Sequence, residues 1–286
     1  MSLVHNARPI GVFDSGIGGL SVLQALQAAL PHEHFLYLAD NAHAPYGEKT
    51  DGFVRQRTHA ITEHLIAEHQ IKALVVACNT ATAAAIHELR AQHPQLPLVG
   101  VEPALKPAAQ LTRTGHVGVM ATRGTVASDK FARLLASVQD QAVFEVCACN
   151  GLALAIEHTT LPAYQGSAPA EVSRLLRSYT QALGSFGSGQ GQIDTLVLGC
   201  THYVFAQDEL QALVGPQVQL VSTGEAVARQ TRRLLEAQGL LHAGPAPLTP
   251  SARLHLLTTG DLAGLQAAAQ RWLHLPAHSC RRAQIA

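Results

Sequence analysis

The sequence predicts an α/β protein made of two similar α/β domains with mainly parallel sheets. The first observation is a strand-to-helix unit, in which the apolar run Ile10–Phe13 leads through a glycine-rich turn into the helical stretch Leu20–Leu30. Further short apolar runs then alternate with longer helical stretches, which is typical of parallel sheets covered by helices. Finally, the unit recurs in the second half, where 117–122 and 196–202 resemble 10–15 and 74–80.

The individual elements follow from hydrophobic period and length. Runs of about four to six apolar residues predict buried strands, and longer stretches with apolar residues at helical spacing predict the covering helices. The last helix carries the only tryptophan, Trp272. The predicted strands are Ile10–Phe13, Phe35–Ala39, Ala73–Ala77, Val117–Thr122, Thr195–Cys200 and Leu254–Leu257, and the predicted helices are Leu20–Leu30, Phe53–His69, Thr80–Gln92, Val126–Val138 and Asp261–Leu273.

The amino-acid composition argues against nucleic acids and membranes as binding partners. The chain has 286 residues, 47% of them hydrophobic, which is enough for two ordinary domains with substantial cores. Lys and Arg (20) balance Asp and Glu (20), so no basic excess favours nucleic acid or an anionic membrane as a partner. The longest apolar runs are far too short to cross a bilayer, and no signal-peptide pattern precedes Asp14. We therefore expect a cytoplasmic protein with no nucleic-acid or membrane partner.

The number and spacing of the cysteines and histidines indicate whether disulfides or a metal site are present. The five cysteines form an odd and sparse set, which favours reduced thiols over a disulfide framework. The 16 histidines show no spacing that closes a metal site. No metal is expected, and each cysteine needs its own explanation.

The glycine-rich turn Asp14–Gly19 admits two interpretations. It lacks the full dinucleotide-binding spacing and the Lys-Ser/Thr of a P-loop, so a nucleotide site is disfavoured. Glycines that permit a tight turn and close backbone approach are the simpler explanation. Free backbone N–H groups at a helix start would also suit a carboxylate.

Two cysteines occupy matching positions at strand ends. Cys78 lies where a buried strand gives way to a helix, with Asn79 and Thr80 available to cap that helix, and Cys200 has the same setting before Thr201 and His202. A helix N-terminus stabilises a thiolate. A lone cysteine is more often a small buried hydrophobe, but ligands bind at the carboxyl ends of strands in open α/β sheets, and two matching thiols favour a role there.

Two thiols facing each other across a cleft between similar halves suit the inversion of a carbon centre. A single base would return the proton to the face it came from, so one cysteine must act as thiolate base and the other as thiol acid. Asp14 and His202 are the nearest groups by sequence that could tune the pair, although Asp14 could equally be a turn or helix cap. The expected active site is the cleft between the two domains.

Five segments in order resemble the cofactor-independent glutamate racemases. They are Asp14-Ser-Gly-Ile-Gly-Gly-Leu-Ser-Val, Asp40 through Pro45-Tyr-Gly-Glu-Lys49, Ala77-Cys-Asn-Thr-Ala81, Val99-Gly-Val-Glu-Pro103 and Leu198-Gly-Cys-Thr-His202, followed near the end by Thr258-Thr-Gly-Asp261. The resemblance implies an isomerase that interconverts L- and D-glutamate without pyridoxal phosphate or metal. It also implies a supply of D-glutamate for peptidoglycan and a homodimer.

The resemblance further implies roles for individual residues. Cys78 and Cys200 resemble the two catalytic bases, Asp14 the acid that assists Cys78, and His202 with Glu157 the pair that assists Cys200. It implies a first domain of 1–98 plus 211–286, carrying Cys78, and a second of 99–210, carrying Cys200. The implied substrate contacts are Asp14, Ser15, Tyr46, Gly47, Asn79, Thr80, Thr122, Thr125, Thr201 and His202.

Three positions depart from the family pattern, and three other functions compete with it. His43 replaces a common arginine, Asn150-Gly151 stands where a proline is common, and Ser222 replaces an aspartate; none of these is a catalytic position. A racemase of another small acid such as aspartate would carry the same thiols, because pocket shape reads side-chain length. A thiol hydrolase using Cys200 and His202 would leave Cys78 without a role. A two-lobed binding protein without catalysis would make both thiols incidental.

Overall fold

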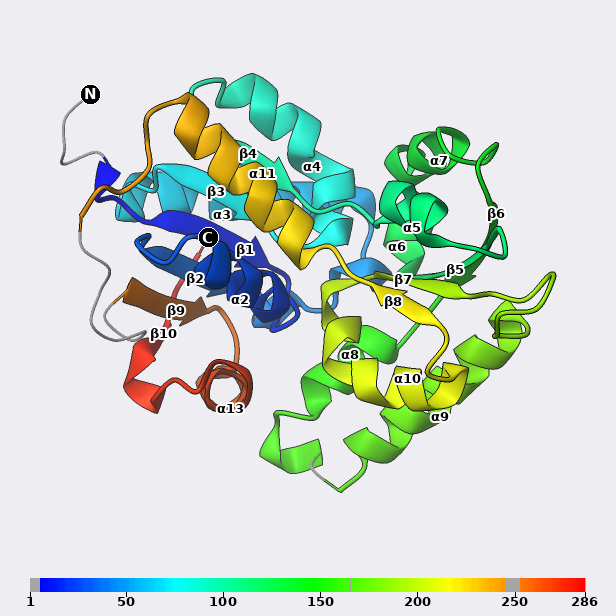
Figure 1. Cartoon of the computed structure of the whole chain (residues 1–286). Helices are drawn as coiled ribbons and strands as arrows, with labels where there is room; N and C mark the ends of the chain where they lie inside the picture. The colour runs from blue at the N-terminus through cyan, green and yellow to red at the C-terminus, as the bar shows by residue number, and fades with distance from the viewer. Residues whose placement is uncertain (1–5, 165, 245–252, 286) are drawn as a thin grey trace.

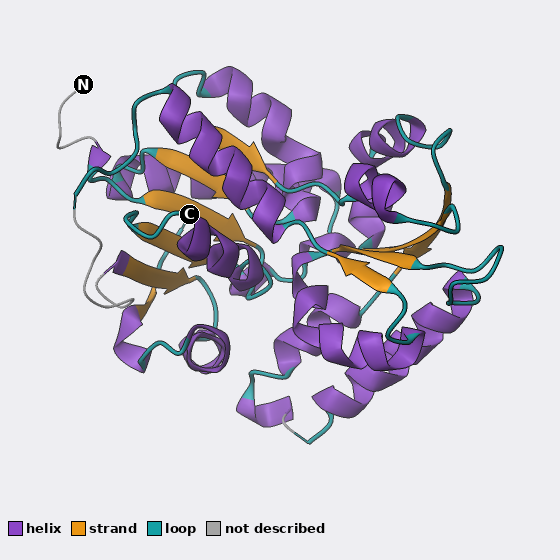
Figure 2. Ribbon diagram, in the orientation of Figure 1, coloured by secondary structure: helices purple, strands orange, loops and turns teal. Residues whose placement is uncertain are grey.

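The computed structural model describes residues 6–164, 166–244 and 253–285, and it contains two parallel sheets with helices around each (Figures 1 and 2). The first sheet has six strands in the order β10-β9-β2-β1-β3-β4, and the second has four in the order β6-β5-β7-β8. Every strand pair in both sheets is parallel. The predicted α/β class with two parallel sheets is confirmed. Among the described residues, no helix is both long and apolar enough to span a membrane.

The elements agree with the predicted ones within a few residues where both exist. The strands are β1 (Ile10–Asp14), β2 (Phe35–Ala39), β3 (Ala73–Val76), β4 (Leu98–Gly100), β5 (His116–Ala121), β6 (Val143–Ala148), β7 (Thr195–Gly199), β8 (Gln219–Val221), β9 (Leu254–Thr258) and β10 (Cys280–Arg282). The α-helices are α2 (Leu20–Ala29), α3 (Asp51–His69), α4 (Asn79–Gln92), α5 (Leu105–Leu111), α6 (Arg123–Val126), α7 (Asp129–Ala136), α8 (Leu152–His158), α9 (Ala168–Leu183), α10 (Gln207–Val214), α11 (Gly224–Ala237) and α13 (Leu262–Leu273). The short 3-10 helices are η1 (Asn41–His43), η2 (Tyr46–Glu48), η3 (Pro162–Tyr164), η4 (Thr201–Ala206) and η5 (Ala277–Ser279).

Strand β1 shows why the first sheet needs helices on both faces. All five of its residues are buried, and successive side chains point to opposite faces. Val12 packs in a core with residues of α2, α11 and α13, and Phe13 packs in a second core with residues of α3 and α4. The helix α11 belongs to this arrangement although it follows the second sheet in sequence, and it lies against α2 (Figure 1).

The second sheet is covered in the same manner. Helices α8, α9 and α10 contribute Ile156, Leu176 and Leu210 to the core on one face. Helices α5 and α7 contribute Leu105 and Phe131 to the core on the other face. Each sheet therefore has its own pair of hydrophobic cores.

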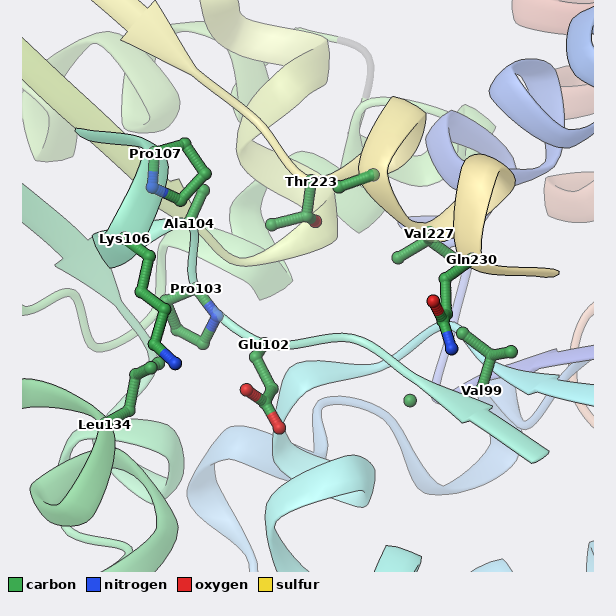
Figure 3. Close-up of a pocket in the computed structure, with 12 residues that line it drawn as sticks. Val99, Glu102, Pro103, Ala104, Lys106, Pro107, Leu134, Thr223, Val227 and Gln230 are labelled. Atoms are coloured by element: carbon green, nitrogen blue, oxygen red, sulfur yellow. The ribbon is translucent and has the colours of Figure 1, made fainter. Parts of the chain in front are cut away.

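The chain crosses between the sheets twice, from β4 into α5 and from β8 into α11 (Figure 1). The first crossing follows β4, which pairs with β3, and the second follows β8, which pairs with β7. A cavity of about 220 Å³ lies where the crossings meet, with Pro103 from one and Thr223 from the other on its wall (Figure 3). Its lining includes neither Cys78 nor Cys200.

The predicted helix over 126–138 requires a correction. The structure has two short helices there, α6 and α7, separated at Ala127 and Ser128. The Thr122 side chain caps α6 by accepting from the Thr125 N–H, and the Ser128 side chain caps α7 by accepting from the Phe131 N–H. A hydroxyl that caps a helix start competes with a continuous helix, and the hydrophobic period alone does not detect this.

The buried side chain of Lys72, just before β3, forms an ion pair with Glu33 and also contacts the C-terminal part of the chain. Lys72 Nζ lies 2.6 Å from Glu33 Oε2, and both side chains are almost fully buried. The ammonium group also donates to the carbonyl oxygens of Asn6 (2.6 Å) and Leu240 (2.8 Å). Burial lowers the pKa of Lys72, and the hydrogen bond that its ammonium group donates to Glu33 opposes that effect.

We expect Lys72→Met to lower the free energy of unfolding by about 3–5 kcal/mol, because it leaves the Glu33 carboxylate buried without its partner. Urea unfolding followed by circular dichroism measures this change. The double variant Lys72→Met/Glu33→Leu should recover most of the loss, since it removes both charges. A single variant as stable as wild type would contradict this role for the pair.

Candidate active site

Three strands end in chemically active side chains where the sheets approach each other. Asp14 ends β1, Cys78 follows β3, and Cys200 follows β7. Strands β1 and β3 are adjacent and in register, with Phe13 opposite Val76, so Asp14 and Cys78 lie at the same sheet edge. The charges of Cys78 and Cys200 are close enough to affect each other. The carboxyl ends of parallel strands are the usual ligand site of such sheets.

Cys78 is itself the N-cap of α4. Its sulfur accepts a hydrogen bond from the Ala81 N–H at 3.5 Å and lies 3.8 Å from Ser15 Oγ. The expected capping by Asn79 and Thr80 is therefore wrong, because the side chain before them takes that position. Burial raises the pKa of the Cys78 thiol well above its usual value, and the neighbouring charge of Asp14 raises it further.

Asp14 both organises the glycine-rich turn and contacts the first thiol. Its Oδ1 accepts from the Ser15 N–H at 2.8 Å, and its Oδ2 accepts from the Gly19 N–H. The Thr201 hydroxyl, from the other half of the molecule, donates to Oδ2 at 3.3 Å. Asp14 also hydrogen-bonds with Cys78, and burial raises its pKa. Asp14 therefore accepts hydrogen bonds within the turn and also contacts Cys78, so the two roles predicted from the sequence do not exclude each other.

Cys200 begins a chain of three side chains. Its sulfur lies 3.7 Å from His202 Nδ1, and His202 Nε2 lies 2.7 Å from Glu157 Oε1. Burial by itself lowers the pKa of His202, but the hydrogen bonds with Cys200 and Glu157 outweigh it, and its pKa is raised well above the usual value. The hydrogen-bond partners on both ring nitrogens thus favour the protonated form of the imidazole between Cys200 and Glu157.

The glycine-rich turn holds Glu157 from the opposite side. The Ile17 N–H donates to Glu157 Oε1 at 2.6 Å, and the Asn41 amide donates to Oε2 at 2.9 Å. A Cβ at Gly16 would lie 1.7 Å from Glu157 Oε1, and one at Gly18 would lie 2.3 Å from His202 Nδ1. The turn thus needs glycine for close approach, and its free N–H groups bind the protein's own carboxylates.

Hydroxyl groups from both halves meet beside the thiols. Thr80 Oγ1 lies 2.9 Å from Thr122 Oγ1, which lies 3.0 Å from Thr125 Oγ1. All three side chains are buried. Thr80 belongs to α4 behind Cys78, and the other two follow β5 in the second sheet. These hydroxyls are polar groups that could hold a small charged ligand between the sheets.

The segment with Tyr46 and Gly47 approaches the same place. The Tyr46 hydroxyl donates to Asp40 Oδ2 at 2.5 Å, so this hydroxyl is committed to Asp40. A Cβ on Gly47 would lie 2.5 Å from the Thr122 Cβ, so the glycine allows the segment to pack against the second half. Tyr46 therefore shapes the site through its backbone and ring, and its hydroxyl supports Asp40.

The structure brings together all the residues that the sequence analysis named for the site. The Asn79 amide donates to the Val101 carbonyl oxygen at 3.5 Å. Sequence reasoning missed Asn41 and the Ile17 N–H, both of which bind Glu157. The sequence feature that could have pointed to Asn41 is its position directly after Asp40, in a segment noted in the sequence analysis. In the described part of the chain, no group of three or more His, Cys, Asp or Glu side chains is arranged to hold a metal ion.

The fold and the site define a class of protein in which two α/β halves each place a cysteine, with a hydrogen-bonded polar neighbour, at the end of a strand where the halves meet. The family model for Asp/Glu/hydantoin racemases matches residues 10–231, and the chain belongs to that family of isomerases. It is thus an enzyme of the racemase class.

Curated relatives support this assignment over most of the chain. The glutamate racemase of Ectopseudomonas mendocina is 49% identical over 263 residues, which cover 92% of this chain and 94% of that protein. The glutamate racemase of Pseudomonas aeruginosa is 48% identical, with 83% and 85% covered.

Solved structures of glutamate racemases have the same fold. Isoform RacE1 from Bacillus anthracis superposes with a TM-score of 0.82 at 30% identity and covers 98% of both chains. The Escherichia coli enzyme, in complex with L-glutamate and the activator UDP-MurNAc-Ala, superposes with a TM-score of 0.79 at 32% identity and covers 98% of this chain and 99% of its own.

The raised pKa of His202 predicts a pH-dependent stability. A histidine whose pKa is raised by folding contributes its full stabilisation below the unfolded pKa of about 6.5 and loses it as pH rises through the folded pKa. The unfolding free energy of wild type minus that of His202→Gln should therefore fall above pH 6.5, by at most about 1.4 kcal/mol per pH unit. Urea unfolding from pH 5.5 to 9 measures it. A difference that grows with pH would show that His202 is buried neutral.

Proposed function

We propose that this chain is a glutamate racemase that interconverts L- and D-glutamate with two cysteine bases. The observation that carries the proposal is the pairing of Cys78 with Asp14 and of Cys200 with His202 and Glu157 at one site. Each thiol has its own partner to exchange a proton with. Inversion at a carbon requires this arrangement, because one group must remove a proton from one face while another supplies one to the opposite face.

In one direction Cys200 acts as the base. The imidazolium of His202, paired with Glu157, stabilises the thiolate at Cys200. The thiolate takes the α-proton, the Cα–H bond breaks, and its electron pair moves into the substrate carboxylate group. The protonated Cys78, whose pKa burial raises, then delivers its proton to the opposite face. The stereocentre is inverted, and the negative charge has moved to Cys78.

In the other direction the roles are exchanged. Cys78 starts as a thiol, so its proton must leave before it can act as a base, and the Asp14 carboxyl group in contact with it is the acceptor. The His202 imidazolium protonates the Cys200 thiolate and remains hydrogen-bonded to Glu157. The Cys78 thiolate then takes the α-proton, and the Cys200 thiol delivers its proton to the other face. Asp14 afterwards releases its extra proton to solvent and His202 takes one up, which restores the starting state. The two enantiomers thus depend on different partner residues.

The polar groups between the thiols are proposed to bind the substrate. The hydroxyls of Thr80, Thr122 and Thr125 are donors suited to a carboxylate group, and Asp14 is an acceptor suited to an ammonium group. The remaining proposed contacts are Ser15, Tyr46, Gly47, Asn79, Thr201 and His202.

Glutamate is favoured over aspartate by the relatives. Those named above are glutamate racemases, and the Escherichia coli enzyme was solved in complex with L-glutamate. A thiol hydrolase would need the contact between Cys200 and His202, which is present, but it would leave the Cys78 and Asp14 pair without a role. The racemase reaction uses both pairs.

The cellular role follows from the family resemblance. We propose that the enzyme supplies D-glutamate for peptidoglycan, acts in the cytoplasm as a homodimer and uses no cofactor, because its own thiols and their partners supply the proton transfers. All five cysteines are free, which supports a reducing compartment.

Both thiols should be required for turnover. With L-glutamate in D₂O and no added cofactor, wild type should show loss of the α-proton signal by NMR together with loss of optical rotation. Cys78→Ser and Cys200→Ser should each lower the racemisation rate by about 10²–10⁴-fold, because a hydroxyl is a far weaker base than a thiolate. The matched control is Cys280→Ser, a buried cysteine in β10, which should retain activity.

The same assay distinguishes the alternatives. Wild type that exchanges nothing with glutamate but racemises aspartate would identify a relative with another specificity. No turnover with either acid would overturn the racemase proposal. Full activity in either single variant at the site would overturn the two-cysteine mechanism.

A further inference from the structure

We propose that Asn41 and Thr258 are positioning residues for the Cys200 side of the reaction, and that they act by holding the Glu157 carboxylate in place from the opposite half of the molecule. The inference rests on the proposed two-cysteine racemase mechanism and extends it. Hydrogen-bond contacts connect five side chains in succession: Thr258, Asn41, Glu157, His202 and Cys200.

The two oxygens of Glu157 have separate donors. Oε1 accepts from the Ile17 N–H at 2.6 Å and lies 2.7 Å from His202 Nε2, whereas Oε2 accepts from the Asn41 amide at 2.9 Å. Glu157 is only 6% exposed, so water cannot readily replace a lost donor. The Asn41 amide therefore contributes to keeping this carboxylate turned toward His202.

Thr258 decides which way the Asn41 amide points. The Gly260 N–H donates to Thr258 Oγ1 at 3.0 Å, and Thr258 Oγ1 lies 3.1 Å from Asn41 Oδ1. The hydroxyl has one proton, and it donates that proton to the Asn41 carbonyl oxygen. The NH₂ group of Asn41 is then the part that faces Glu157, where a donor is needed.

The backbone around Asn41 is anchored, so its amide is preorganised. The neighbouring Asp40 accepts hydrogen bonds from Arg57, Tyr46 and Thr259. These bonds hold the pKa of Asp40 below its usual value although burial alone would raise it. The Thr259 hydroxyl also accepts from the Ala42 N–H at 3.2 Å. The motif Thr258-Thr-Gly-Asp261 therefore holds the Asp40–Asn41 segment in place through Thr258 and Thr259.

The arrangement links assembly of the site to its chemistry. Glu157 and His202 belong to the second half of the molecule, whereas Asn41, Thr258 and the Ile17 N–H belong to the first. The hydrogen bonds from Asn41 and the Ile17 N–H to Glu157 therefore form only when the halves are in contact.

The test compares Asn41→Asp and Thr258→Val with wild type. Asn41→Asp replaces the donor with a second carboxylate beside Glu157, and kcat should fall about 10- to 100-fold, the effect of losing a hydrogen bond to a charged group. Thr258→Val keeps the side-chain shape but frees the amide to turn, and we expect a smaller fall in the same direction. The charge-matched control Gln190→Glu, on an exposed loop, should leave kcat unchanged.

A second readout separates positioning from a loss of structure. The primary isotope effects on kcat/KM are measured with α-deuterated L- and D-glutamate. Raising the barrier at Cys200 alone should increase the isotope effect for the enantiomer whose proton Cys200 removes and decrease it for the other. Asp14→Asn, which acts on the Cys78 side, should shift the two isotope effects in the opposite sense.

Each outcome decides between the proposals. Divergent isotope effects in Asn41→Asp, opposite to those of Asp14→Asn, support the inference. An unchanged kcat, or isotope effects that change equally for both enantiomers while urea unfolding is unaltered, would overturn it. Wild type that does not racemise glutamate would overturn the proposed function itself, which is a separate result.

Discussion

The contact between the glycine-rich turn and Glu157 is the constraint on which the site depends. A buried carboxylate must have donors, and here one is a backbone N–H that a side chain at Gly16 or Gly18 would push away. The turn must therefore be made of glycine, the two halves must approach closely, and His202 must lie where Glu157 can hold it. A short segment after β1 thus sets the distance between the two sheets.

Other contacts across the interface reinforce this approach. The rings of Phe205, just after the Cys200 turn, and Trp272 in α13 stack with centroids 3.9 Å apart. The Gly151 N–H donates to Glu48 Oε1 at 3.0 Å. These contacts lie at different points of the interface between the two halves. Each one that forms lowers the entropy cost of forming the next, so the contacts are cooperative.

The two thiols differ in their surroundings although their strands are similar. Cys78 lies beside a carboxyl group and has a raised pKa, whereas Cys200 lies beside an imidazole whose own pKa is raised. A negative neighbour favours the thiol form of a cysteine, and a positive neighbour favours the thiolate. In the proposed reaction, this difference suits Cys78 to the role of acid and Cys200 to the role of base when L- or D-glutamate first binds.

The sequence by itself determined the α/β class and the strands that carry Cys78 and Cys200. These are local properties, because hydrophobic period and strand-end position depend on neighbours along the chain. It did not identify β4 and β8 as strands, since their membership of a sheet depends on pairing with distant strands. Only the tertiary structure decided that Asn41 and Thr258 support Glu157, more than 100 residues away from each of them in sequence. Hydrogen bonds between such distant residues leave no spacing in the sequence, because they exist only after both halves have folded and met.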